Sequence, residues 1–252
     1  MIELDHPFVV FVIVLVAQWL ALYIGGRLGV RFGRLKEDER RDFDLIQSAT
    51  LTLLGLIIGF SFSMAVTRYD QRKNYEEAEA NAIGTEYVRA DLLLPEDSAH
   101  VRELLRQYLE RRIAIYAAPR DNAVLAEIDR DTTKLEEQLW SAILRSANAK
   151  PNPVTALAVS GMNDVLNSQG YTQAAWWNRI PVSAWALMGL IAIASNLMVG
   201  YGARKKGLLV FALPLIVSFA FLLIADIDSP RGGIIRVQPQ NLVALSQSMK
   251  AQ

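Results

Sequence analysis

Hydrophobic residues form two blocks, one toward each end of the chain, and most charged residues lie between the blocks. Within the blocks, four segments are apolar for long enough to be membrane spans: residues 8–30, 45–66, 182–199 and 208–224. A helix of about 20 residues, rising ~1.5 Å per residue, crosses the ~30 Å hydrocarbon core of a bilayer. The pattern therefore predicts four transmembrane helices. Pro214 falls inside the fourth, where neighbouring helices are expected to satisfy the backbone group that it frees.

The second span continues into charged sequence without a break. Between Leu53 and Arg89 there is no proline, although the sequence changes from apolar to amphipathic. We therefore expect one helix to leave the membrane and to extend through water to about Leu94, where Pro95 would end it. Helices of this kind are common in channels and in membrane-anchored signalling stalks.

The middle of the chain has helical periodicity that is interrupted by prolines. Apolar residues recur there every three or four positions, and no stretch alternates for long enough to be a strand. Ser98 and Asp121 are the expected N-caps of two of these helices. The predicted fold class is an all-α membrane protein with four transmembrane helices and an extramembrane helical bundle between spans two and three.

This organisation divides the chain into four parts. Transmembrane helices one and two occupy residues 1–66, and the extramembrane helical bundle occupies residues 67–180. Transmembrane helices three and four occupy residues 181–226, and residues 227–252 form a C-terminal tail.

Composition and motifs exclude several classes of function. The 26 basic and 26 acidic residues cancel, so the chain has no basic footprint for a nucleic-acid partner. There is no cysteine, and the two histidines, His6 and His100, are far apart in sequence. No zinc-protease, P-loop, dinucleotide-binding or nucleophile-elbow motif occurs. We predict no enzyme activity, no catalytic residue, no metal site and no cofactor.

Basic residues in the short loops predict the orientation in the membrane. The N-terminus carries acidic Glu3 and Asp5, the loop after the first span is basic, and Arg-Lys-Lys at 204–206 lies between spans three and four. The first loop contains Arg31, Arg34, Lys36, Arg40 and Arg41. Basic short loops face the cytoplasm. We therefore expect a multi-pass protein of the cell inner membrane, with these loops cytoplasmic and the helical bundle on the outer side.

Glycines at intervals of four mark two spans. Gly25, Gly29 and Gly33 lie at the end of the first span, and Gly55 and Gly59 lie in the second. Small residues at this spacing let helices approach closely in lipid, so these glycines are the predicted helix-packing residues.

A stripe of residues along the second span has two possible interpretations. At ~100° per residue, Thr52, Leu56, Phe60 and Ser63 fall within a stripe about 80° wide. From the pattern alone, packing against another helix is the more common explanation. Hydrophobic rings that gate a pore by dewetting are the alternative, in which case these four residues form a pore constriction.

The acidic residues that follow this span also have two readings. Glu76, Glu77 and Glu79 lie on the amphipathic part of the long helix among basic residues. A solvated face with pairs at i,i+4 is the ordinary explanation. A ring of carboxylates at a pore mouth, contributed by several subunits, is the functional one.

The second span resembles the pore-lining span of bestrophin channels. The similarity lies in residues 57–68, IIGFSFSMAVTR, which contain a Gly-Phe step and a Val-Thr-Arg ending followed by Tyr69. The resemblance implies a homo-oligomeric ion channel, pentameric by analogy, in which span two lines the pore. It places the three-ring hydrophobic neck of the family on Thr52, Leu56 and Phe60. It also implies that the bundle is cytosolic, opposite to the side that the loop charges predict.

Further motifs are similar to bacterial membrane proteins with a bestrophin-like domain of unknown function. They are residues 79–85, EANAIGT, together with Arg89 and the turn at 228–233, DSPRGG. Bestrophins have an acidic calcium clasp after their fourth span. Here only Asp226 and Asp228 are acidic and no acidic run follows, so calcium regulation is not expected.

Two hypotheses from different classes follow. In the first, the chain is a homo-oligomeric channel whose partners are ions, the lipid bilayer and its own copies. In the second, it is a membrane-anchored helical scaffold or sensor that binds a protein partner and conducts nothing. Current across a bilayer distinguishes them.

Overall fold

The computed structural model describes residues 6–33, 35–119, 121–203 and 208–251, and every regular element within these ranges is helical. Contacts divide the chain into two units. Unit 1 comprises Met1–Tyr69 and Arg179–Arg236, and unit 2 comprises Asp70–Asn178 and Val237–Gln252. The expected orientation rests partly on residues outside the described ranges, namely Glu3, Asp5, Arg34 and residues 204–206.

Helix α2 (Glu37–Arg89) contributes its first part to unit 1 and its remainder to unit 2. The predicted continuity of this helix from Leu53 to Arg89 is confirmed. A short 3₁₀ turn, η1 (Ala90–Leu92), follows it.

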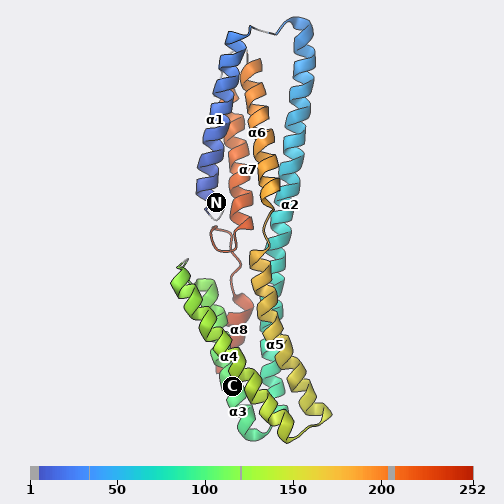
Figure 1. Ribbon diagram of the computed structural model, residues 1–252, viewed down its shortest axis with the longest axis vertical. Coiled ribbons are helices and arrows are strands. Elements are labelled where there is room, and N and C mark those ends of the chain that lie inside the picture. Colours follow the sequence, from blue (N-terminus) through green and yellow to red (C-terminus); the bar gives the residue numbers. More distant parts are fainter. Residues whose placement is uncertain (1–5, 34, 120, 204–207, 252) are drawn as a thin grey trace. The chain divides into compact units, whose positions relative to one another are not determined.

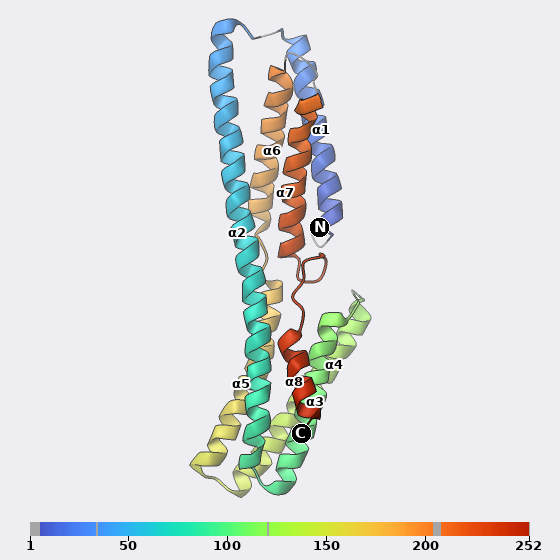
Figure 2. The ribbon, with the colours of Figure 1, turned by 180° about the vertical axis from the view of Figure 1, so that it is seen from behind.

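Unit 1 contains the apolar helices of the chain. Beside the first part of α2 it holds α1 (Pro7–Arg31), α6 (Val182–Gly202), η2 (Leu208–Phe211) and α7 (Ala212–Asp228). Helix α1 packs against both α6 and α7, and the three run alongside one another in both views (Figure 1, Figure 2). All four predicted spans therefore fall in helices. Among the described residues, three segments are long and apolar enough to cross a membrane, in Pro7–Arg31, Glu39–Leu92 and Pro153–Gly202, whereas α7 has 17 residues.

The surface of unit 1 is apolar and part of its interior is polar. Large side chains such as Phe8, Val12, Leu190 and Ile216 are exposed. Buried polar residues occur in the same helices, among them Gln18, Ser195, Asn196 and Ser218. An apolar surface of this extent is unusual for a protein that faces water on all sides. The distribution is the one expected for helices surrounded by lipid, and it indicates a membrane protein.

A buried hydrogen-bond network links three helices of unit 1. The amide of Asn196 in α6 donates to Gln18 Oε1 in α1 at 2.8 Å, and Gln18 Nε2 donates to Ser218 Oγ in α7 at 3.2 Å. Ser218 in turn donates to the Pro214 carbonyl at 2.7 Å. Polar side chains inside a bundle in lipid have few other partners, so such bonds fix which helices meet.

Pro214 was expected inside the fourth span, but it lies near the start of a helix. It lies in the first turn of α7, after η2. Backbone N–H groups of the first turn have no partner within the helix, so a proline there costs no hydrogen bond.

Glycines of α1 and α6 bring these two helices into backbone contact. A methyl group added to Gly25 would collide with the Leu197 carbonyl, and one added to Gly29 would come within 2.8 Å of the Tyr201 carbonyl oxygen. Gly200 on α6 lies equally close to the Leu22 carbonyl of α1. Gly33 differs, because it follows the end of α1 with φ of +92° and has nothing within 4 Å of its added methyl. Glycine at this position therefore allows a left-handed backbone conformation and does not serve helix packing.

Unit 2 is a helical bundle built on the second part of α2. Its other helices are α3 (Pro95–Ala117), α4 (Asn122–Ala149), α5 (Pro153–Trp177) and α8 (Gln240–Lys250). Helix α3 packs against α4 and α8, and α4 packs against α5. The shared core contains Ile83, Leu105, Leu139, Met162 and Leu242, each fully or almost fully buried.

Three details of unit 2 bear on the sequence predictions. Asp121 is confirmed as the N-cap of α4, accepting the Ala123 N–H at 2.8 Å. Ser98 was expected to cap a helix, but α3 begins earlier, at Pro95, and Ser98 lies buried in its first turn. Proline is favoured at a first helical position because its φ is preset and no hydrogen bond is lost. The C-terminal residues, expected only as a tail, form α8 and belong to unit 2 from Val237 onward.

Replacing Gly200 with alanine should destabilise unit 1, because the new methyl group meets backbone atoms of α1 that cannot move independently. We expect a loss of about 1–3 kcal/mol, typical of overpacking. Gly189→Ala in the same helix is the matched control, since nothing lies within 4 Å of that methyl group. Thermal unfolding of the protein in detergent, followed by circular dichroism, measures both variants. Equal midpoints for the two would contradict the backbone contact.

Candidate functional site

The predicted stripe on α2 is exposed in the single chain. Leu56 is 54% exposed and Phe60 is 63% exposed, and Thr52 and Ser63 are exposed beside them. On the opposite side of the helix, Leu54, Ser61 and Ala65 are buried and belong to the interior of unit 1. The stripe is therefore not the face with which α2 packs inside its own chain.

The residues in and beside the stripe are compatible with close contact against another molecule. The Thr52 hydroxyl donates to the Ser48 carbonyl at 2.9 Å, so its hydrogen-bonding need is met within the helix. Such back-bonding lets threonine lie on an apolar surface at low cost. Gly55 and Gly59 have nothing within 4 Å of an added methyl group, so they take no part in packing within the chain.

Beyond Ser63, the same helical face carries polar residues, among them the charged Asp70. At ~100° per residue, Thr67, Asn74, Asn81 and Thr85 continue the stripe of Leu56. All four are exposed. We call the exposed face of α2 that includes Thr52, Leu56, Phe60, Ser63, Thr67, Asn74, Asn81 and Thr85 the open face.

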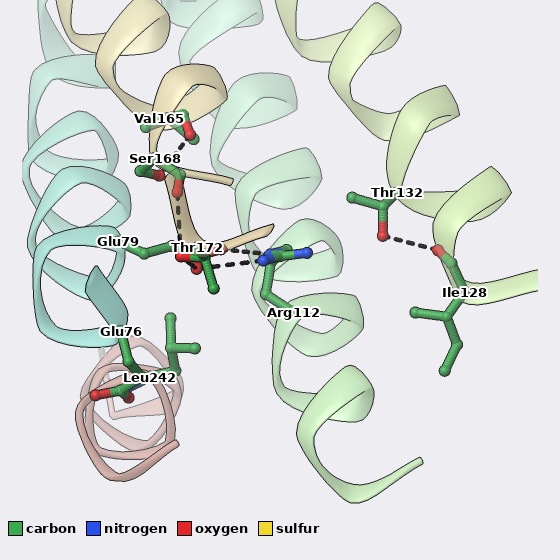
Figure 3. A network of polar contacts seen from close by, with 9 residues as sticks. All are labelled: Glu76, Glu79, Arg112, Ile128, Thr132, Val165, Ser168, Thr172 and Leu242. Carbon is green, nitrogen blue, oxygen red and sulfur yellow. Dashed lines mark hydrogen bonds and ion pairs between the residues drawn. The ribbon is translucent and has the colours of Figure 1, made fainter. Parts of the chain in front are cut away.

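An ion pair holds the opposite face of α2 inside unit 2. Arg112 of α3 makes two contacts with the Glu79 carboxylate, through Nε to Oε1 and through Nη2 to Oε2 at 3.3 Å (Figure 3). The Thr172 hydroxyl of α5 donates to Glu79 Oε2 at 2.9 Å. Glu79 and Arg112 are almost completely buried. One carboxylate of α2 thus joins α3 and α5.

The charge state of this pair is set by its own geometry. Burial opposes the charged form of Arg112, but the adjacent Glu79 carboxylate outweighs burial and raises the pKa of the guanidinium. Arg112 therefore remains charged in the interior. Removing either one would leave the other as an unpaired charge in the interior, which is far costlier than the pair itself.

Glu76 anchors α8 in a similar way. Its Oε1 accepts the backbone N–H groups of Asn241 at 2.9 Å and Leu242 at 3.0 Å, and its Oε2 accepts the Asn241 amide at 2.7 Å. The carboxylate therefore satisfies N–H groups at the N-terminus of α8, where negative charge is favoured. Of the three acidic residues in this part of α2, only Glu77 is exposed. Both sequence readings of this run, a solvated face and a carboxylate ring, fail for Glu76 and Glu79.

Two more carboxylates hold the turn after α7. Asp226 accepts the N–H groups of Ile234 and Ile235 at 2.8 Å each, and Asp228 accepts the Ile180 N–H at 3.1 Å. Backbone donors thus occupy the oxygens of Asp226. No group of three or more histidine, cysteine or carboxylate side chains that could hold a metal occurs among the described residues. The geometry assigns these aspartates to the turn.

Sequence patterns did not single out Arg112, Gln18 or Asn196, although signals for them exist. Arg112 follows Tyr108 and Leu109 at helical spacing and precedes Tyr116, so it lies on the apolar stripe of its own helix. A charged residue on such a stripe signals a buried pair. Gln18 and Asn196 are amides within otherwise apolar spans, which is a comparable signal.

Comparison with known proteins identifies the family. The sequence model of the bestrophin-like domain matches residues 45–242, which extend from α2 into α8. The chain belongs to the bestrophin-like family. The predicted resemblance to the bestrophin-like family is thereby confirmed.

Solved structures of bestrophin homologues share the fold. A point variant of a bacterial bestrophin homologue from Klebsiella pneumoniae matches with a TM-score of 0.67 at 12% identity, covering 98% of this chain and 99% of that one. The homologue from the same organism solved by zinc phasing matches with a TM-score of 0.62 at 14% identity, covering 96% and 95%. A second variant gives a TM-score of 0.66 at 13% identity, covering 96% and 98%. No match was found among curated proteins.

Replacing Arg112 with methionine should strongly destabilise unit 2, because the Glu79 carboxylate would stay buried without its cation. We expect a loss of about 3–5 kcal/mol in the free energy of unfolding. Arg111→Met is the matched control. That neighbouring arginine is half exposed and lies 3.9 Å from Asp131, so its loss should cost less than about 1 kcal/mol. Chemical denaturation monitored by circular dichroism compares them, and similar losses would refute the role of the buried pair.

Proposed function

We propose that this protein is an ion channel formed by several copies of the chain, pentameric by analogy with bestrophins, in which the open face of α2 lines the pore. The observation that carries the proposal is the exposed stripe of Thr52, Leu56, Phe60 and Ser63 on an apolar helix of a bestrophin-like fold. In a ring of subunits this stripe would face the axis, because the buried side of α2 already belongs to its own chain.

Leu56 and Phe60 would form the constriction. Rings of large apolar side chains narrow a pore and exclude water from it, which raises the barrier to ions without any charged group. Thr52 and Ser63 would flank the constriction with hydroxyl groups. Gly55 and Gly59 would serve contacts between neighbouring copies, since they pack against nothing within the chain.

The proposed membrane domain has four spans in each subunit. Helices α1 and α6 and the first part of α2 have the length and apolarity required. Helix α7, with 17 residues, is at the short end of the range for a spanning helix, and η2 precedes it directly. Family membership favours a channel over an enzyme. A scaffold that binds a protein partner is the alternative and would conduct no ions.

The side of the membrane on which unit 2 lies is open to a direct test. The basic loops favour the outer side, whereas the bestrophin resemblance favours the cytosol. Because the chain has no cysteine, a Glu127→Cys substitution at an exposed position of α4 provides a single thiol for labelling. With family membership established, we expect this thiol in intact cells to be protected from a membrane-impermeant reagent. Labelling without permeabilisation would place unit 2 outside.

Truncating the constriction should open the proposed pore. In planar bilayers, Leu56→Ala combined with Phe60→Ala should raise conductance or leak severalfold, because two apolar rings are removed. Phe8→Ala combined with Leu190→Ala is the matched control: these side chains are 63% and 66% exposed but lie on α1 and α6. Flux that is unchanged in the first pair would contradict the constriction. Folded, inserted protein that conducts nothing in any variant would favour the scaffold.

A further inference from the structure

The Glu86 carboxyl group of α2 is buried in unit 2. Glu86 is 0% exposed, and neither of its carboxyl oxygens has a hydrogen-bond partner among the described residues. It differs in this from Glu76 and Glu79, whose carboxylates accept several hydrogen bonds. A buried ionised carboxylate without donors is strongly unfavourable, so such a group tends to hold its proton.

Gly161 of α5 forms the notch that receives this carboxyl group. A methyl group added to Gly161 would collide with Glu86 Oε2 and would come within 2.5 Å of Arg89 Nη1. The neighbouring α5 residues Ala158 and Met162 are fully buried in the core of unit 2. The carboxyl group therefore lies directly in the contact between α2 and α5.

Two charges act on Glu86, one from each helix of this contact. Arg89 of α2 favours the ionised carboxylate, but it also donates to the Leu157 carbonyl at 3.4 Å. Asp164 of α5 opposes ionisation. Burial is the largest effect, and the pKa of Glu86 is raised to about 8. Near neutral pH the group is therefore mainly protonated.

We propose that Glu86 is a proton-operated latch between α2 and α5. In its protonated form it fits the notch at Gly161 and lets the two helices pack. When it loses its proton, the negative charge is buried without a hydrogen-bond donor and near Asp164, Arg89 compensates it only in part, and the contact loosens. This device belongs to unit 2 alone, so it stands whether or not the protein conducts ions.

The direction of the pH effect follows from linkage. The pKa of Glu86 is higher in the folded protein than the ordinary value of 4.5. Its contribution to stability is therefore fully present below pH 4.5 and is lost as the pH rises through about 8. Burial also raises the pKa of Glu136, but that residue lies on α4, where the charge of Arg112 acts on it. Glu86→Gln isolates the latch, because glutamine has the shape of the protonated acid and does not titrate.

Thiol accessibility measures the opening of the contact. The cysteine-free chain allows Ala158→Cys, which places one buried thiol on α5 next to the notch. Its labelling rate is compared with that of the same cysteine in a Glu86→Gln background, so that the ionisation of the thiol itself cancels in the ratio. We expect the ratio to be near one at about pH 4.5, to rise with pH above it, to reach half of its final value near pH 8 and then to level off. Ser160→Cys, exposed on α5, should give a ratio near one throughout.

A second variant tests the assignment. Asp164→Asn removes a negative charge that raises the pKa of Glu86, so the midpoint should move to lower pH. If the buried thiol disturbs folding, the thermal midpoints of the cysteine-free protein and of Glu86→Gln are compared instead, and their difference should grow with pH up to about 8. A labelling ratio, or a difference in thermal midpoints, that does not change with pH would overturn the latch. A transition that Asp164→Asn leaves unmoved would assign it to another group and would also overturn it.

Discussion

The structure depends on the two opposite faces of one helix. α2 buries one side in each unit, while its other side is exposed among the described residues. The buried side is held in unit 2 by the Glu79 carboxylate, which takes the Arg112 guanidinium from α3 and the Thr172 hydroxyl from α5. Separating these charges would leave each one buried and unpaired, so this pair fixes the rotation of α2 within unit 2. It thereby fixes which α2 residues of that unit remain exposed, among them Asn74, Asn81 and Thr85.

The same logic operates with weaker groups in unit 1. There the polar contacts are neutral amides and a hydroxyl, Gln18, Asn196 and Ser218, and the close approach of α1 and α6 relies on Gly25 and Gly200. Neutral hydrogen bonds and backbone contact suit a lipid environment, in which apolar side chains alone do not select a partner helix. The open face of α2 remains available for neighbouring copies or for a pore.

Much of the fold could be predicted from the sequence because its elements are long and strongly patterned. The apolar spans and the uninterrupted run through Arg89 required only hydropathy and the absence of proline. The start of α3 was predicted four residues late, with Ser98 instead of Leu94 as the N-cap, because Ser98 has the chemistry of a cap, whereas Pro95 has the backbone geometry of a first turn. Helix α8 was missed because its short apolar face becomes meaningful only with Glu76 at its N-terminus, a contact between residues far apart in sequence.

The candidate site was predictable in part. Periodicity identifies Leu56 and Phe60 as one stripe, but it cannot distinguish a packing face from an exposed one. Burial makes that distinction, since Leu54 and Ser61 fill the interior instead. The acidic residues illustrate the converse: Glu76, Glu77 and Glu79 look alike in the sequence, and only tertiary contacts divide them into two anchors and one surface group.

Two serines of α2 test whether its open face lines a pore. Ser63 is on the open face, and Ser61 is buried on the opposite side of the helix. In the cysteine-free chain, each is replaced in turn by cysteine, and bilayer current is recorded while a small, hydrophilic thiol reagent is added. The reagent should block current through Ser63→Cys and leave Ser61→Cys unaffected. Equal block of both variants, or block of Ser61→Cys alone, would contradict a pore lined by the open face.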